Sequence, residues 1–259
     1  MPRIDKAREA FLKKDLKKMK LFHAPRLVHR AIHNGEKKNN SFILPQIILG
    51  GQDGLVNVLG LILGVAAATS DSRLVIISGL AMTFAESFSM AAVAYNSKLA
   101  EADYYQSELE REKWEIENNP NGEKEEIKAL YENYGFQGKQ LEEIIEKITS
   151  DKKNWLQVMM EQELKLEKVD RRQAFPDALI VGVAALIGSL TPLLPFFFLP
   201  VTVSVWLSVI ITSLILFGIG YYKAKITLGR NFLKMGFEMM AIGMLSALVG
   251  YLVGSLFKV

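Results

Sequence analysis

The stretch ILGGQDGLVNVLGLILG, residues 48–64, is apolar and rich in glycine, yet Asp53 lies near its start. About 20 consecutive and mostly apolar residues are enough for a helix to cross a lipid bilayer. A carboxylate inside hydrocarbon costs roughly 2.5–3.5 kcal/mol on insertion scales. Because ionisable groups inside membranes usually mark ion paths or proton relays, Asp53 is a candidate functional residue.

Four further segments share this apolar character, so that the five runs are 42–69, 74–99, 176–199, 201–222 and 232–257. Long apolar stretches alternate with densely charged ones, which is typical of a membrane protein. We therefore expect an all-α membrane protein with five transmembrane helices and a helical insertion between the second and third. The absence of cysteine excludes disulfides, thiolate zinc sites and cysteine nucleophiles.

Basic residues in the connections predict the orientation of the chain. Lysines crowd the N-terminal segment, Arg171 and Arg172 close the insertion, and the turn KAKITLGR, residues 223–230, is basic. Since basic loops stay in the cytoplasm, we expect the N-terminus and the insertion there and Val259 on the opposite side. The expected parts are a basic cytoplasmic segment (1–41), helices 1–2 (42–99), a cytoplasmic helical insertion (100–172) and helices 3–5 (173–259). No signal peptide is visible.

The basic segment has two interpretations. Apolar residues occur near helical spacing in the stretch IDKAREAFLKKDLKKMKLF, residues 4–22. They are Ile4, Ala7, Phe11, Leu16 and Met19. This spacing favours an amphipathic helix on the cytoplasmic membrane face, and a partly disordered basic arm is the alternative.

The sequence carries no enzyme signature. It has no GxxxxGK[ST] phosphate loop, no nucleophile elbow and no dinucleotide fingerprint. We expect no catalysis, no nucleic-acid partner and no permanently bound cofactor. His29 and His33 are one helical turn apart and could hold a metal, but a role at the cytoplasmic interface is favoured.

The second span contains another carboxylate, Glu86, with Met82 one turn before it and Met90 one turn after it. Ordinary packing is the alternative explanation for either methionine. Carboxylate oxygens suit hard divalent cations, and thioethers add a preference for softer transition metals. A path lined by Asp53, Glu86 and methionine would fit Fe²⁺ or Mn²⁺ better than sodium or calcium.

Glycines accompany these residues. Gly50, Gly51 and Gly54 flank the carboxylate of the first span and would let backbone and ion approach closely. The spacings Gly60–Gly64 and Gly250–Gly254 allow close helix contact, including contact between two copies of the chain.

The insertion, residues 100–170, is acidic and favours helix. A turn signal at NNPNGE, residues 118–123, and a break between Gly135 and Gly138 divide it into three or four short helices, the first continuing out of the second span. Its expected apolar core consists of Leu130, Tyr134, Ile144, Ile145 and Ile148.

Acidic residues in the insertion recur at helical spacing, as in the pairs Glu112–Glu115 and Glu123–Glu126. Met159, Met160 and Glu163 follow on a later helix, so three helices could aim carboxylates and a thioether at one point. Spacing alone favours a solvated acidic surface instead. The insertion has no histidine, which excludes the Glu-x-x-His pattern of di-iron bundles.

Taken in order, these features resemble the vacuolar iron transporter family, and the resemblance covers nearly everything from His29 to the C-terminus. The motifs that carry it are Asp-Gly-Leu-Val at 53–56, Ser-Met-Ala at 89–91 with Tyr95 and Ser97, the acidic run from Glu101 through Tyr105, Arg111 and Glu112, Met159-Met160 with Glu163, and Pro192 with Pro195.

The resemblance implies a homodimer in the lipid bilayer, with an ion path at the dimer interface and proton-coupled export of Fe²⁺. It implies that Asp53 and Met90 are path ligands. It also implies a metal-binding domain built from Glu112, Glu115, Glu123, Glu126, Met159, Met160 and Glu163. One departure is that some members carry a carboxylate about where Met82 stands, whereas this chain has Glu86 one turn later.

The leading hypothesis is a proton-coupled transporter of Fe²⁺, or of Mn²⁺, in a plasma or vacuolar-type membrane. The alternative is a membrane-anchored helical protein that binds or oxidises iron without transporting it. The lack of histidine in the insertion argues against this alternative.

Overall fold

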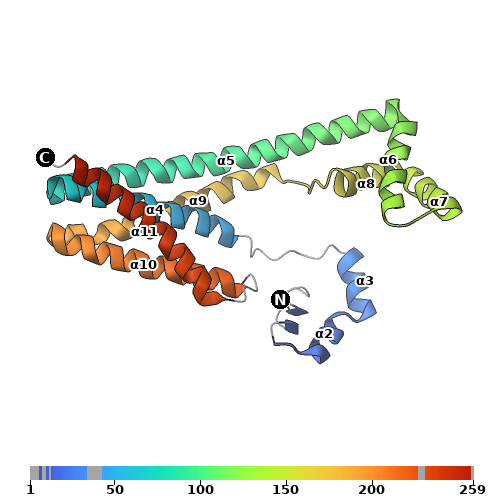
Figure 1. The fold of residues 1–259 in the computed structure, drawn as a ribbon. Coiled ribbons are helices and arrows are strands. Elements are labelled where there is room, and N and C mark those ends of the chain that lie inside the picture. The colour runs from blue at the N-terminus through green and yellow to red at the C-terminus, as the bar shows by residue number, and fades with distance from the viewer. Residues whose placement is uncertain (1–5, 8–9, 12, 34–42, 227–230, 258–259) are drawn as a thin grey trace. The chain divides into compact units, whose positions relative to one another are not determined.

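The computed structural model describes residues 6–7, 10–11, 13–33, 43–226 and 231–257, and all regular structure in these residues is helical (Figure 1). The chain forms two compact units. One unit combines Met1–Ala92 with Asp177–Val259, and the other consists of Val93–Pro176.

Among the described residues, five helices are long and apolar enough to cross a membrane, which confirms the five predicted spans. They are α4 (Ile43–Thr69), α5 (Ser72–Asn118), α9 (Ala174–Leu193), α10 (Val201–Ile226) and α11 (Phe232–Leu256). A short 3₁₀ helix, Leu194–Phe197, extends α9.

Helix α5 continues past Leu99 without a break and ends at Asn118, which confirms that the first helix of the insertion continues out of the second span up to the turn predicted at residues 118–123. At 1.5 Å per residue its 47 residues extend about 70 Å, roughly twice the thickness of the hydrocarbon layer. Closely spaced charges follow Lys98, beginning with Glu101 and Asp103, and these cannot all lie in hydrocarbon. The second half of α5 therefore lies outside the membrane.

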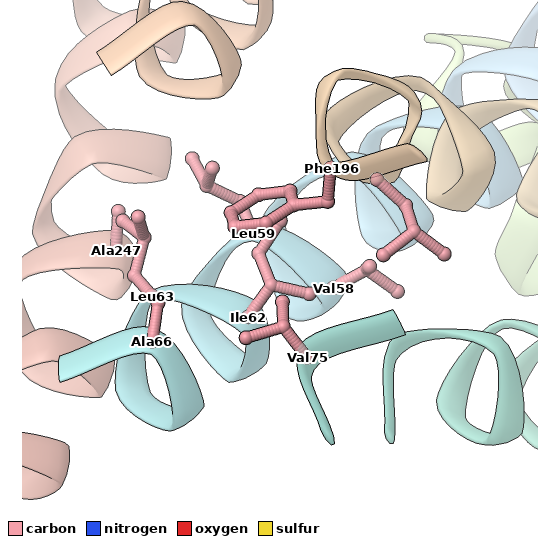
Figure 2. Close-up of a cluster of buried hydrophobic side chains, with 9 residues drawn as sticks. Val58, Leu59, Ile62, Leu63, Ala66, Val75, Phe196 and Ala247 are labelled. Carbon is pink, nitrogen blue, oxygen red and sulfur yellow. The ribbon is translucent and has the colours of Figure 1, made fainter. Parts of the chain in front are cut away.

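The unit that combines Met1–Ala92 with Asp177–Val259 is called the membrane unit below. A hydrophobic cluster forms its centre (Figure 2). It brings together one face of α4, the start of α5, the end of α9, the 3₁₀ helix and α11. Its buried members are Val58, Leu59, Ile62, Leu63, Ala66, Val75, Leu193, Phe196 and Ala247.

Glycines let α9 pack directly on the backbone of α4. A Cβ atom added at Gly50 would collide with the carbonyl oxygen of Val181, and one added at Gly54 would lie 2.6 Å from Ser189 Oγ. A Cβ at Gly188 would likewise meet the carbonyl oxygen of Gly51. The glycines around Asp53 therefore serve helix packing. Atoms of α9 occupy the space beside Gly50 and Gly54 into which an ion was expected to approach.

The second set of glycines joins α4 to α11. A Cβ at Gly250 would meet the carbonyl oxygen of Gly60, and a Cβ at Gly254 would meet that of Gly64. Both predicted glycine pairs thus face each other within one chain, as close helix contact requires. Earlier on α11, Gly236 faces the ring of Phe217 on α10.

The unit Val93–Pro176 contains the end of α5 followed by α6 (Pro120–Asn133), α7 (Gly138–Thr149) and α8 (Lys152–Val158). Asn119 caps α6, since its side chain accepts a hydrogen bond from the N–H of Gly122, and Pro120 occupies the first turn. The predicted break before α7 is confirmed, with Gly135 at φ 91° and Gly138 at φ 54°. A π-helix, Met159–Glu163, follows α8 directly.

The core of this unit differs in part from the prediction. Its fully buried members are Ile116, Ile127, Trp155 and Met159, and the predicted Ile145 and Ile148 pack against them. Tyr134 was expected in the core but is 67% exposed, because it lies at the end of α6 where the chain turns toward α7.

The described residues of the N-terminal segment include the short helices α2 (Leu16–Phe22) and α3 (Pro25–His33). The single amphipathic helix expected over residues 4–22 is interrupted, because Lys14 adopts a positive φ of 51° and Asp15 caps the start of α2. Ile4, the first residue of the expected apolar face, and the side chain of His33 lie outside the described residues.

Candidate metal sites

Three glutamates from two helices meet in the unit Val93–Pro176. Glu112 and Glu115 lie on one face of α5, and Glu123 lies in the first turn of α6 after the Asn119 cap. One carboxylate oxygen from each of the three lies within 4.8 Å of the others. Glu112 and Glu123 are only 1% and 3% exposed, so this group is not the solvated acidic surface that spacing alone favoured.

Several carboxylate oxygens at this place have no hydrogen-bond donor among the described residues. Oε2 of Glu112, Oε2 of Glu123 and Oε2 of Glu163 are buried, and none accepts a hydrogen bond from the part of the chain that the structure describes. Buried polar atoms are nearly always satisfied, so three such oxygens need an explanation. A divalent cation is the simplest group that would satisfy them, because it prefers several carboxylate oxygens.

Burial makes these carboxylates hold protons unusually well. It raises the pKa of Glu112 to about 7, and the Arg111 guanidinium opposes this increase. Burial and then the neighbouring Glu126 raise the pKa of Glu123 to about 7, and the same two causes raise the pKa of Glu163. A cation that binds here near neutral pH must therefore displace protons.

Arg111 holds one edge of the group. Its Nη2 lies 2.7 Å from Oε1 of Glu112, its Nη1 lies 2.5 Å from Oε2 of Glu115, and its Nε donates a hydrogen bond of 2.9 Å to Glu108. The sequence prediction assigned no role to Arg111 or Glu108. Their spacing offered a signal, since residues three and four apart on a helix are neighbours.

The other predicted members of the metal-binding set differ in how deeply they are buried. Glu126 is exposed, although its charge acts on both Glu112 and Glu123. Met159 is fully buried and packs in the hydrophobic core, which is the ordinary role of a methionine. Met160 is also buried, at 2% exposure. The π-helix that carries these methionines packs against α6.

The second predicted site lies between the membrane helices. Glu86 on α5 is 7% exposed and bridges two neighbouring helices. Asn57 Nδ2 on α4 donates a hydrogen bond of 2.6 Å to one oxygen of Glu86, and Ser189 Oγ on α9 donates one of 3.2 Å to the other. Asp53 interacts electrostatically with the same carboxylate. The structure thus joins the two predicted membrane carboxylates and adds two neutral donors that the sequence prediction missed.

A cavity adjoins this group. It has a volume of about 580 Å³ and is lined by α4, α5 and α11, with Asn57, Met82 and Ser246 among its walls. Met82 also packs against the hydrophobic cluster of the membrane unit, and Met90 is half-buried on α5. Asn57 therefore contacts the Glu86 carboxylate and also faces the cavity.

Comparison with known proteins gives consistent matches. A sequence model of the VIT family matches residues 44–255. Vacuolar iron transporter 2 of Oryza sativa subsp. japonica is 34% identical over 210 residues, which cover 81% of this chain and 85% of the relative. Vacuolar iron transporter 1 of the same plant is 33% identical over 225 residues, 86% and 89% of the two chains. The vacuolar iron transporter of Plasmodium falciparum is 29% identical over 240 residues, 89% and 86% of the two chains.

Proposed function

The chain belongs to the VIT family, and from this premise we propose that it moves a divalent transition-metal ion, Fe²⁺ or else Mn²⁺, out of the cytosol in exchange for protons. Family membership supports a membrane protein that transports metal ions and is not an enzyme. The proton coupling, the direction and the metal preference are our proposals.

The observation that carries this proposal is the group of buried carboxylate oxygens without donors in the unit Val93–Pro176. Glu112, Glu115 and Glu123 would collect the ion, with Glu163 and Glu126 adding negative charge. Met159 and Met160 would supply thioethers if their side chains turned toward the ion. Carboxylate and thioether ligands together favour Fe²⁺ or Mn²⁺ over calcium.

Asp53 and Glu86 would form the step inside the membrane. Two neighbouring carboxylates repel each other, and either a proton or a cation between them relieves the repulsion. Binding of the metal would therefore release a proton, and reprotonation would release the metal, which couples the two fluxes. Asn57 and Ser189 would hold Glu86 meanwhile, and Met82 and Met90 would provide softer ligands along the path.

We propose the arrangement in the membrane from loop charge and family membership. Basic residues before α4 and around Arg171 would keep the N-terminus and the insertion in the cytosol, with the C-terminus on the other side. The names of the relatives support a vacuolar-type membrane, and a plasma membrane is the alternative. A homodimer would place the α4 and α5 helices of two copies beside one path.

Transport into proteoliposomes tests the proposal. We expect Fe²⁺ uptake to rise when the vesicle interior is more acidic, because outward proton flow would drive the metal inward. Asp53→Asn and Glu86→Gln should abolish this dependence. The matched control is Asp71→Asn, which alters an exposed carboxylate in the turn between α4 and α5. Uptake that ignores the pH gradient, or that survives Asp53→Asn, would contradict the mechanism.

A second candidate function is favoured by the compactness of Val93–Pro176, which has its own hydrophobic core. In this alternative the unit binds or oxidises iron and the membrane helices serve as an anchor. If the unit oxidises iron, the full-length protein would consume oxygen when Fe²⁺ is added, and Asp53→Asn would leave this rate unchanged. If it only binds iron, Asp53→Asn would leave Fe²⁺ binding unchanged and proteoliposomes would show no Fe²⁺ uptake. The transport proposal expects no oxygen consumption above that of protein-free buffer.

A further inference from the structure

One guanidinium group contacts three carboxylates in the unit Val93–Pro176. Arg111 lies on α5 three residues after Glu108, directly before Glu112 and four residues before Glu115, and it pairs with all three at 2.5–2.9 Å. Charge-assisted hydrogen bonds of this length are the stronger ones in proteins, and the planar arginine fork fixes their directions. Arg111 is therefore a structural clamp on two of the three glutamates that form the candidate metal site.

The clamp divides the oxygens of Glu112 into two kinds. Oε1 pairs with Arg111, whereas Oε2 is buried and has no donor within the described chain. Rotation about the last side-chain bond of glutamate is otherwise broad, so an unheld carboxylate would spread over many orientations. With one oxygen fixed, the other keeps a single direction.

We propose that Arg111 is a positioning residue of the metal site: it fixes one oxygen each of Glu112 and Glu115 so that their other oxygens are available to the ion. The inference rests on the proposed function, since it assumes that these carboxylates receive the transported metal. It assigns Arg111 a role outside the ligand set, as partners that hydrogen-bond to ligating carboxylates orient them in other metal sites.

The positive charge of Arg111 has an opposing effect, because it repels an incoming dication. Two observations decide which effect is larger. The Arg111 side chain is 43% exposed, so water screens its charge, whereas the Glu112 side chain that it holds is 1% exposed. Glu108 also anchors the guanidinium through Nε, a different nitrogen from the two that contact Glu112 and Glu115. Orientation therefore outweighs repulsion, and loss of Arg111 weakens metal binding.

Mn²⁺ binding to the purified full-length protein, followed by calorimetry and by the Mn²⁺ electron paramagnetic resonance spectrum, tests the inference. Arg111→Gln should weaken binding about 10–100-fold and broaden the bound-ion spectrum, as losses of such partners do. Arg111→Lys should recover only part of the affinity, because one ammonium cannot hold two carboxylates in fixed directions. The matched control is Lys152→Gln, which removes one charge from the exposed Lys152–Glu117 pair in the same unit.

Glu108→Gln provides a second variant in case Arg111→Gln does not fold. It removes the negative charge that pairs with Arg111 Nε and leaves Arg111 and the proposed ligands in place, so we expect a smaller loss of affinity with the same broadening. Unchanged or tighter binding by Arg111→Gln, full affinity in Arg111→Lys, or no effect of Glu108→Gln would overturn the inference alone. Absence of Mn²⁺ and Fe²⁺ binding by the unaltered protein would overturn the proposed function and this inference with it.

Discussion

Acidification should weaken metal binding to the Glu112–Glu115–Glu123 group far more than ordinary glutamates would allow. Burial raises the pKa of Glu112 and of Glu123 to about 7, so both are largely protonated at about pH 5.5 and largely ionised at about pH 7.5. A metal ion needs the ionised form, and protons compete with it at each carboxylate.

The size of the effect follows from these pKa values. One group with a pKa of about 7 reduces the apparent affinity about 25-fold between about pH 7.5 and about pH 5.5. Two coupled groups give a loss between about 25-fold and about 600-fold, depending on how strongly their protons interact. Glutamates with the ordinary pKa of 4.5 would change the affinity by only about 10% over the same range.

Calorimetric titration of the full-length protein with Mn²⁺ at the two pH values measures this change. Repeating the titration in buffers of different protonation enthalpy counts the protons that are released. Glu123→Gln should reduce the pH dependence, because it removes one of the titrating groups. A dissociation constant that changes by less than about threefold across this range would refute the reasoning.

Stability of the ion-free protein should show the opposite trend with pH. The folded carboxylates have a higher pKa than in the unfolded chain, so the folded state binds more protons. Their contribution to stability is present below about pH 4.5 and is lost as the pH rises through about 7. Thermal unfolding of the unit Val93–Pro176 should therefore fall to lower temperature across this window, and Mn²⁺ should reverse the loss near neutral pH. An ion-free melting temperature that rises from pH 5.5 to 7.5 would contradict this account.

Three substitutions probe the packing and the membrane site. Gly54→Ala should lower the thermal stability in detergent by about 1–3 kcal/mol, because its Cβ would lie 2.6 Å from a side-chain oxygen of α9, whereas Gly218→Ala, with no atom within 4 Å, should not. Trp155→Ala should cost about 3–5 kcal/mol, and Trp114→Ala, at a 63% exposed position, should be nearly neutral in the same melting assay. Asn57→Leu removes the 2.6 Å hydrogen bond to the membrane carboxylate of α5, and Fe²⁺ flux into proteoliposomes should fall about 10–150-fold, since such bonds contribute about 1.5–3 kcal/mol; unchanged flux would contradict this role.

Hydropathy predicted the five spans well, because each span must be apolar along its whole length whatever its neighbours are. Turn chemistry predicted the breaks at Asn119–Pro120 and at Gly135–Gly138, because those residues determine the local backbone by themselves. The continuation of α5 past Lys98 was predicted as well, since the charged residues that follow favour helix and the first turn signal after them is at residues 118–123.

Contacts between distant residues lay beyond the sequence prediction. Glu86 and Ser189 are 103 positions apart, and the packing of α9 on Gly54 of α4 and, through Gly182, on α5 brings them together. Spacing placed Glu112 and Glu115 on one face, but it did not show that Glu112 is buried or that Arg111 occupies one of its oxygens. The family resemblance named the glutamates of the insertion, and three of them, Glu112, Glu123 and Glu163, have a buried oxygen with no donor among the described residues.

The glycines of α11 also restrict how its length can change. Gly236 and Gly250, separated by two heptads, and Gly254, one turn further, all meet neighbouring helices of the same chain. Insertion of one residue between Gly236 and Gly250 would rotate the following part of the helix by about 100° and turn side chains toward the backbone of α4. A whole heptad, by contrast, would nearly preserve the facing direction. Length variation in α11 should therefore be confined to its two ends or occur in steps of seven residues.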